Sequence, residues 1–268
     1  MIKKICLVAL LLTGCSQMGV RPEGSGDTVA STTPTFHPTE ESKTGTPRMR
    51  AQAHAELGLK YFDQGNLAVA LEEARIAQAF DADYAPGYRL MALVQMGLRE
   101  RPQALTSFQT AERLAPNDPD INNDFGFFLC QEGRETDGLQ RLMTAIKNPL
   151  YRTPSRAWHN AGLCYLRLRD DKAAADAFRQ ALAMDPANLA AMFLLSEINY
   201  RAQDYFEARR FLSELHRRMQ PNAETLWLGL RIERKAGDRE AEASFATQLR
   251  RNFAGSPQYQ ALMQGKFE

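Results

Sequence analysis

The stretch of sequence that decides the fold runs from Gly162 to Pro186 and reads GLCYLRLRDDKAAADAFRQALAMDP. A small residue opens it, and Ala174, Phe178 and Ala181 follow at offsets of 12, 16 and 19. Apolar residues three or four apart lie on one face of an α-helix. Pro186, at an offset of 24, is expected to end that helix, because proline lacks an N–H and clashes with the preceding turn. The stretch therefore predicts two short helices that pack together.

The same pattern recurs in phase along the chain, at spacings of 33 to 36 residues. The small residue returns at Gly58, Ala92, Gly126, Gly162, Ser196 and Gly229. A second small residue follows each at an offset of 12: Ala70, Ala104, Gly138, Ala174, Ala208 and Ala241. A larger side chain where two helices approach closely would overpack, which typically costs about 1–3 kcal/mol. Such repetition predicts a stack of similar units that share one continuous core.

This pattern resembles the tetratricopeptide repeat over about residues 51 to 255. The resemblance implies an all-α fold, a right-handed α-solenoid of about six repeats. We expect the repeats to occupy residues 49–255 and residues 256–268 to form a C-terminal cap or tail. Gly65, Gly133 and Gly237 fall in the short turns between helices, where a left-handed conformation is often needed. The run Arg231, Glu233, Arg234 and Lys235 suggests that the sixth repeat supplies the polar end of the array.

The N-terminus reads as an export signal over residues 1–14. Two lysines precede eight apolar residues, Ile5 to Leu12, a run too short to span a bilayer, which needs about 20 residues. The sequence from Leu12 to Cys15 resembles a bacterial lipobox, which implies lipidation, including palmitate, on Cys15. Ser16 is not an aspartate, and by the sorting rule of such lipoproteins this implies the periplasmic face of the outer membrane. Residues 15–48, rich in Ser, Thr, Pro and Gly, are expected to be a lipidated flexible tether.

The middle of the array departs from the regular spacing. Two prolines, Pro149 and Pro154, lie where the spacing widens to 36, so a longer ordered loop is expected. The Asn122-Asn123 pair, the Asn148-Pro149-Leu150-Tyr151 segment, the lipobox and the repeats together resemble the PilF/PilW family of type IV pilus biogenesis lipoproteins. The resemblance covers essentially the whole mature chain. It implies a pilotin-like scaffold that assembles or localises the pilus secretin, and so a role in pilus (fimbrium) stability and twitching motility.

Two cysteines, Cys130 and Cys164, remain after lipidation and removal of Cys6 with the signal. In the repeat register they fall on the first helices of adjacent repeats, where a Cα–Cα distance of about 4.4–6.8 Å is feasible. We predict a disulfide, because the periplasm is oxidising and members of the resembled family can carry one here. The alternative is two buried free thiols that pack as small hydrophobic side chains.

The first helices of tetratricopeptide arrays line a concave surface. Mapping the repeat phase onto this chain predicts a protein-binding groove formed by Leu59, Phe62, Arg89, Leu93, Met96, Asn123, Phe127, His159, Asn160, Leu163, Tyr200 and Arg201. Apolar side chains interleaved with amides suit an extended or helical peptide. The alternative for each apolar residue is packing between helices.

The sequence contains no motif for catalysis, for a metal or for a cofactor. The chain has 33 Lys and Arg residues against 32 Asp and Glu residues, so it has no strong positive field that would attract nucleic acid. We therefore expect a non-enzymatic monomer without cofactor or metal. It would be tethered to the membrane by its lipid and would bind a protein partner, the type IV pilus secretin. Two alternatives stay open: a tetratricopeptide adaptor for β-barrel assembly or cell-wall enzymes, and a periplasmic enzyme.

Overall fold

The computed structural model describes residues 45–267, and every regular element in that range is an α-helix. The all-α expectation is confirmed. The predicted signal segment, Cys15 and the tether up to residue 44 lie outside the described residues. The helices are α1 (Pro47–Asp63), α2 (Leu67–Phe80), α3 (Ala85–Gly97), α4 (Arg101–Leu114), α5 (Pro119–Gln131), α6 (Glu135–Lys147), α7 (Pro154–Arg167), α8 (Asp171–Met184), α9 (Leu189–Arg201), α10 (Tyr205–Arg218), α11 (Ala223–Ala236), α12 (Arg239–Asn252) and α13 (Pro257–Met263).

Helix α1 begins inside the segment that the sequence assigned to the tether. Thr46 caps it by accepting a hydrogen bond from the backbone N–H of Met49, 3.3 Å from the Thr46 hydroxyl oxygen. Pro47 occupies the first turn, where its missing N–H costs nothing. None of the helices between residues 45 and 267 is both long enough and apolar enough to cross a bilayer.

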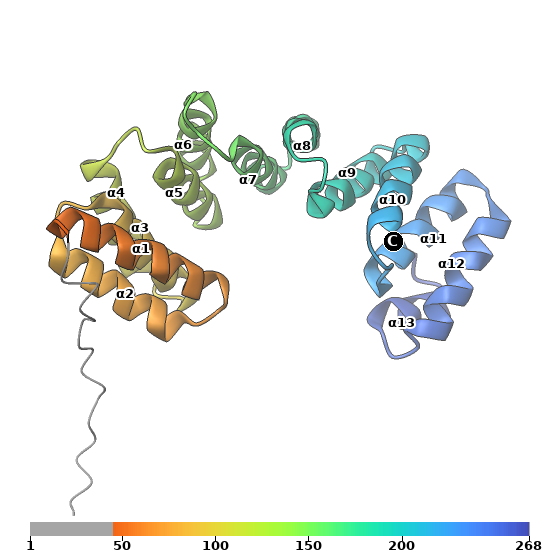
Figure 1. Cartoon of the computed structure of the whole chain (residues 1–268). Coiled ribbons are helices and arrows are strands. Elements are labelled where there is room, and N and C mark those ends of the chain that lie inside the picture. Colours follow the sequence, from red (N-terminus) through yellow and green to blue (C-terminus); the bar gives the residue numbers. More distant parts are fainter. Residues whose placement is uncertain (1–44, 268) are drawn as a thin grey trace, which may run out of the picture.

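Consecutive helices pair, and each pair contacts the next one along the chain. The six pairs are α1 with α2, α3 with α4, α5 with α6, α7 with α8, α9 with α10, and α11 with α12. They follow one another along an arch, and the short helix α13 packs against α11 and α12 at the C-terminal end (Figure 1). The chain is thus a helical solenoid, as the repeat pattern predicts.

The small residues of the pattern lie where two helices meet. A Cβ atom added to Gly138 on α6 would lie 2.6 Å from the carbonyl oxygen of Gly126 on α5. A Cβ added to Gly162 on α7 would lie 2.5 Å from the ring of Phe178 on α8. In the sixth pair the equivalent Ala241 and Phe245 are only half-buried, because within residues 45–267 no further helix pair packs on α12.

The turn inside each pair contains a residue in the left-handed conformation. Gly65, Gly133 and Gly237 have φ values of 76°, 78° and 83°, which confirms the sequence prediction. In the other three pairs the same place is taken by residues with a side chain: Arg99, Arg169 and Gln203, with φ values of 64°, 60° and 63°. The left-handed residue therefore recurs in all six turns.

The widened spacing corresponds to the loop 148–153 between α6 and α7, whose first residues are fixed by hydrogen bonds. The side-chain amide of Asn148 donates to the carbonyl oxygen of Asn117 at 2.9 Å, and the backbone N–H of Leu150 donates to Asn148 Oδ1 at 2.9 Å. Pro149 lies in the loop and Pro154 starts α7, so neither interrupts a helix. The expected longer, ordered loop is present.

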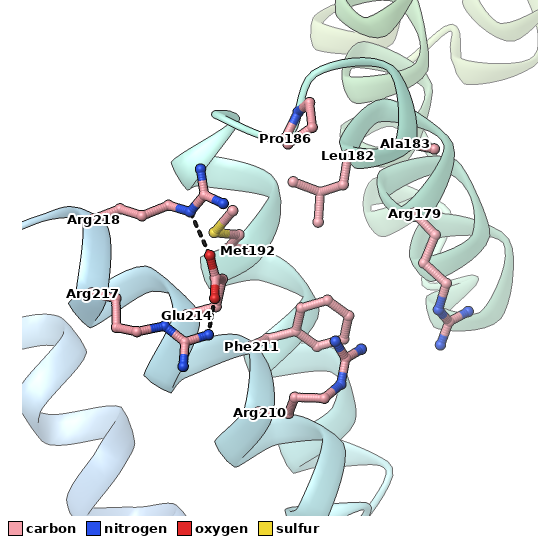
Figure 2. Close-up of a pocket in the computed structure, with 10 residues that line it drawn as sticks. All are labelled: Arg179, Leu182, Ala183, Pro186, Met192, Arg210, Phe211, Glu214, Arg217 and Arg218. Carbon is pink, nitrogen blue, oxygen red and sulfur yellow. Dashed lines mark hydrogen bonds and ion pairs between the residues drawn. The ribbon is translucent and has the colours of Figure 1, made fainter.

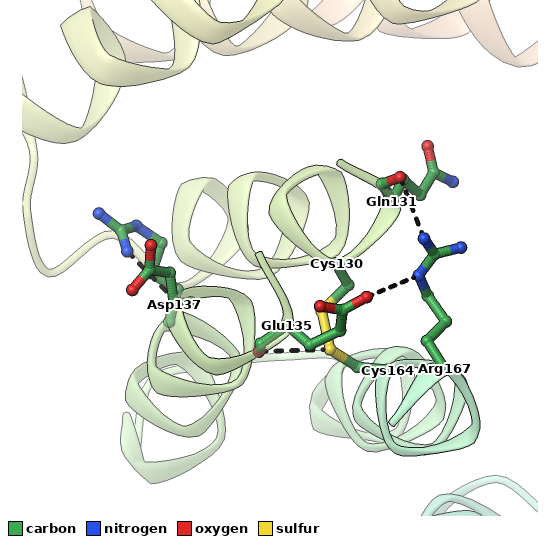
Figure 3. The surroundings of a disulfide bond; sticks show 7 residues. Cys130, Gln131, Glu135, Asp137, Cys164 and Arg167 are labelled. Carbon is green, nitrogen blue, oxygen red and sulfur yellow. Dashed lines mark hydrogen bonds and ion pairs between the residues drawn. A yellow bond between two sulfur atoms is a disulfide. The ribbon is translucent and has the colours of Figure 1, made fainter. Parts of the chain in front are cut away.

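Cys130 on α5 and Cys164 on α7 are joined in a disulfide, with their Cα atoms 5.5 Å apart (Figure 3). Both residues are buried in a cluster that also contains Leu142 and Ala157. Beside the disulfide, Arg167 donates from Nε to Glu135 Oε1 at 3.2 Å. The third and fourth pairs are therefore held together covalently as well as by packing.

Candidate protein-binding surface

The first helices of the pairs line the inner side of the arch. First helices of neighbouring repeats contact each other in four places: α1 with α3, α3 with α5, α5 with α7, and α9 with α11. No two successive second helices between residues 45 and 267 make comparable contact. The side on which neighbouring helices lie closer together is the inside of the curve. The predicted groove residues all lie on these first helices, and that they form a binding groove stays a prediction.

A buried polar network occupies the middle of this surface. Asp124 on α5 accepts a hydrogen bond from Arg89 Nε on α3 at 2.5 Å and forms an ion pair with Arg156 on α7. Burial alone would lower the pKa of Arg89, but the carboxylates of Asp124 and Asp120 reverse this and raise the pKa. A buried carboxylate that lost these partners would be left unpaired, at a cost of about 3–5 kcal/mol. The network thus fixes three successive first helices relative to each other.

The two predicted groove asparagines belong to the same network. Asn160 Nδ2 donates to Asn123 Oδ1 at 3.0 Å, and Asn123 Nδ2 donates to Asp124 Oδ1 at 2.8 Å. Asn123 has 0% exposed surface, and Asn160 is also buried. Their amides therefore link α5 to α7. In this conformation Asn123 does not offer its amide to a guest, contrary to the role suggested by its position.

Most apolar members of the predicted groove combine packing with partial exposure. Six of them are half-buried and pack against the hydrophobic clusters beneath the surface: Leu59, Phe62, Leu93, Met96, Leu163 and Tyr200. Phe127 is also half-buried but belongs to none of the hydrophobic clusters within residues 45–267. The packing alternative thus applies to the six, each of which keeps part of its surface exposed.

The remaining predicted residues have local partners. The ring of His159 lies 5.4 Å from that of Phe178, and Asn188 Nδ2 lies 3.3 Å from His159 Nδ1. Burial lowers the pKa of His159, so its ring is neutral at pH 7 and can accept at Nδ1. Arg201 is exposed and forms two hydrogen bonds of 2.9 Å with the carboxylate of Asp171. Both sets of contacts join residues of neighbouring helices or loops, as is common in the packing of a folded chain.

A cationic hollow that the sequence did not indicate lies at the C-terminal end of the concave side. It has a volume of about 420 Å³ and is lined by Tyr200, Arg231, Arg234, Lys235, Arg239, Gly265 and Phe267. The guanidinium of Arg231 lies 4.9 Å from the ring centre of Tyr200, and that of Arg234 lies 3.8 Å from that of Phe267. Such cation–π contacts hold guanidinium groups at a surface where they can meet carboxylates.

The sequence had assigned the basic run of α11 to a polar end cap. This assignment is wrong for Glu233, which is buried and accepts a hydrogen bond from Arg209 Nε at 2.8 Å. The feature of the sequence that could have indicated the cationic hollow was the spacing of Arg231 and Lys235, which are one helical turn apart. It could be connected with Tyr200 only through the stacking of α9 against α11. In the part of the chain that the structure describes, no group of three or more His, Cys, Asp or Glu side chains could hold a metal ion.

Comparisons with known proteins agree with this architecture. Residues 155–188 match the tetratricopeptide repeat model. The type IV pilus assembly protein PilF of Pseudomonas aeruginosa is 28% identical over 214 residues, which cover 80% of this chain and 85% of PilF. A solved structure of Pseudomonas aeruginosa PilF has a TM-score of 0.73 at 27% identity and covers 81% of this chain and 97% of its own. The crystal structure of PilW, a widely conserved type IV pilus biogenesis factor, has the same TM-score at 24% identity and covers 80% and 98%.

Proposed function

Given that this chain is a tetratricopeptide-repeat protein homologous to PilF, we propose that it is a non-enzymatic scaffold for type IV pilus biogenesis. The observation that carries the proposal is the extent of the similarity. It covers 80% of this chain and 85% of PilF, and so includes the irregular middle of the array as well as the repeats. A shared repeat alone would support only a protein-binding role.

The finer proposal is a pilotin-like role. Lipidated at Cys15 and anchored at the periplasmic face of the outer membrane, the chain would hold a segment of the pilus secretin on its concave side. The half-buried apolar side chains there, Phe127 among them, would take side chains of that segment. The Asp124 network and the disulfide would hold α3, α5 and α7 in place before binding, which lowers the ordering cost of association.

The role is tested by deleting the gene and measuring secretin multimers in outer membranes, surface pili and twitching. Loss of multimers and pili, restored by the wild-type gene, is expected. Complementation with Phe127→Glu should fail, because a carboxylate would face an apolar guest. Arg113→Glu, a change on the exposed side of α4, should restore function. Normal multimers and pili in the deletion strain would exclude the proposal.

The lipid anchor is tested separately with a Cys15→Ser variant. Radioactive palmitate should label the wild-type chain but not the variant. The variant should appear in the soluble periplasmic fraction, because stable anchoring needs the acyl chains. Equal labelling of both proteins would show that Cys15 is not the acceptor.

A further inference from the structure

The outer face of the array also carries a hollow, between the second helices α8 and α10 (Figure 2). Its volume of about 410 Å³ falls in the range of ligand sites. Leu182, Met192 and Phe211 give it an apolar interior, with Pro186 at one side (Figure 2). Phe211 is itself packed into the cluster beneath α8, so the floor of the hollow belongs to the folded core.

Positive charge surrounds this apolar interior. Four guanidinium groups line the hollow, those of Arg179, Arg210, Arg217 and Arg218, with Glu214 as the single lining carboxylate. Glu214 serves two of them: Arg218 Nε lies 2.6 Å from Glu214 Oε1, and Arg217 pairs with the other oxygen. Since a guanidinium has five N–H donors, both arginines keep donors for a further acceptor.

The other two arginines pair with carboxylates one turn back on their own helices. Arg210 Nε lies 2.9 Å from Glu207 Oε1, and Arg179 lies 2.8 Å from Asp176 Oδ1. Neither carboxylate lines the hollow. Arg210, Arg179 and Asp176 are about half exposed, and Glu207 is 29% exposed. Exposed pairs typically contribute only about 0–1 kcal/mol. A guest carboxylate can therefore share or replace such a partner at little cost.

An exposed aromatic side chain extends the apolar surface along α10. Phe206 is 74% exposed, although it is a large apolar residue. It precedes Arg210 by four residues and Glu214 by eight, so the three lie along one face of the helix. The outer groove, which we define as the hollow between α8 and α10 together with Phe206, thus combines an apolar floor and an apolar end with a cationic rim.

We propose that the outer groove binds a peptide segment of a partner protein in which large apolar side chains are flanked by acidic residues. The apolar side chains would enter against Leu182 and Phe211. The acidic residues would pair with the arginines, whose planar guanidinium groups match carboxylates in two-point hydrogen bonds. This site is separate from the concave surface, so one chain could hold two segments at once.

The proposal is tested with the full chain, purified in a non-ionic detergent, and a short fluorescein-labelled peptide that carries a Leu-Phe pair between glutamates. Fluorescence anisotropy should show saturable binding that weakens as salt rises. The double variant Arg179→Glu/Arg217→Glu should lose at least about tenfold in affinity, because two attractive pairs become repulsive. Both positions are exposed, so folding should survive, and thermal melting checks this.

Two controls make the result specific. Arg113→Glu reverses a charge on the exposed side of α4, outside the groove, and should leave the affinity unchanged. A peptide with lysines in place of the glutamates should not bind, and one with serines in place of the Leu-Phe pair should bind at least about tenfold more weakly. The proposal is overturned if the wild-type chain does not bind the acidic peptide, or if the double variant or the lysine peptide binds as well as its parent.

Discussion

Gly138 and Gly126 set the closest helix approach in the middle of the array. A Cβ atom on Gly138 would lie 2.5 Å from Cys130 Sγ and 2.6 Å from the carbonyl oxygen of Gly126. One contact is backbone and the other is a disulfide sulfur, so neither can move aside as the end of a flexible side chain would. Packing at native density leaves no room for the extra atom.

We therefore expect Gly138→Ala to lower the free energy of unfolding by about 1–3 kcal/mol, despite the better helix propensity of alanine. Thermal and urea denaturation measure this. Gly255→Ala is the matched control, since a Cβ there meets no atom within 4 Å, and it should change stability by no more than about 0.5 kcal/mol. Equal effects of the two substitutions would contradict the packing argument.

His159 illustrates how burial makes stability depend on pH. Burial lowers the pKa of His159 below its ordinary value near 6.5, so the unfolded chain binds a proton more readily than the folded one. The stability that this difference in proton binding contributes is fully present above a pH of about 6.5. It falls as the pH drops from about 6.5 toward the folded pKa.

The measurement is the free energy of unfolding at several pH values between about 8 and 5. The wild-type chain should lose more stability on acidification than His159→Gln, which cannot titrate. His216, whose pKa burial also lowers, remains in both proteins and contributes equally to each. Parallel pH profiles would mean that His159 does not contribute.

Among the elements, the turns inside the six pairs repeat one conformation with different residues. Glycine occupies the left-handed place at Gly65, but Arg99 and Arg169 occupy it in the second and fourth pairs. For a residue with a Cβ atom, the left-handed conformation costs about 1–2 kcal/mol of conformational energy. The turn persists there because the helices on either side are packed and over-determine it.

Arg99→Gly should therefore stabilise the chain, by about 0.5–1 kcal/mol after the greater flexibility of glycine in the unfolded state is subtracted. Arg113→Gly, the same substitution in the last turn of α4, should instead destabilise by up to about 1 kcal/mol. The midpoints of thermal unfolding should shift in opposite directions. Shifts of the same sign would show that backbone strain does not govern the turn.

At the scale of the whole molecule, the repeats within residues 45–267 pack mainly on their neighbours, so the stability of the array depends on the junctions between them. The junction between the third and fourth pairs contains the longest connection within the array, residues 148–153. The disulfide and the Asp124 network both cross this junction. They reinforce the place where the regular repeat is interrupted.

Removing the disulfide should weaken the array. The cysteines are 34 residues apart, and closing a loop of this size contributes up to about 3–4 kcal/mol. We expect Cys130→Ala/Cys164→Ala to lower the urea midpoint. The reductant dithiothreitol should do the same to the wild-type chain and leave the double variant unaffected. A wild-type midpoint that does not respond to complete reduction would contradict this.

The sequence by itself determined the helical pairs, the turns at Gly65, Gly133 and Gly237 and the loop after α6. Each of these follows from a periodic pattern or from a proline or glycine acting on its immediate neighbours. Only the tertiary structure decided that Asn123 and Asn160 bond to each other and that arginines from α8 and α10 surround one hollow. These contacts join residues on different repeats. Their partners depend on how the stacked helices are rotated against one another, and no local pattern records that rotation.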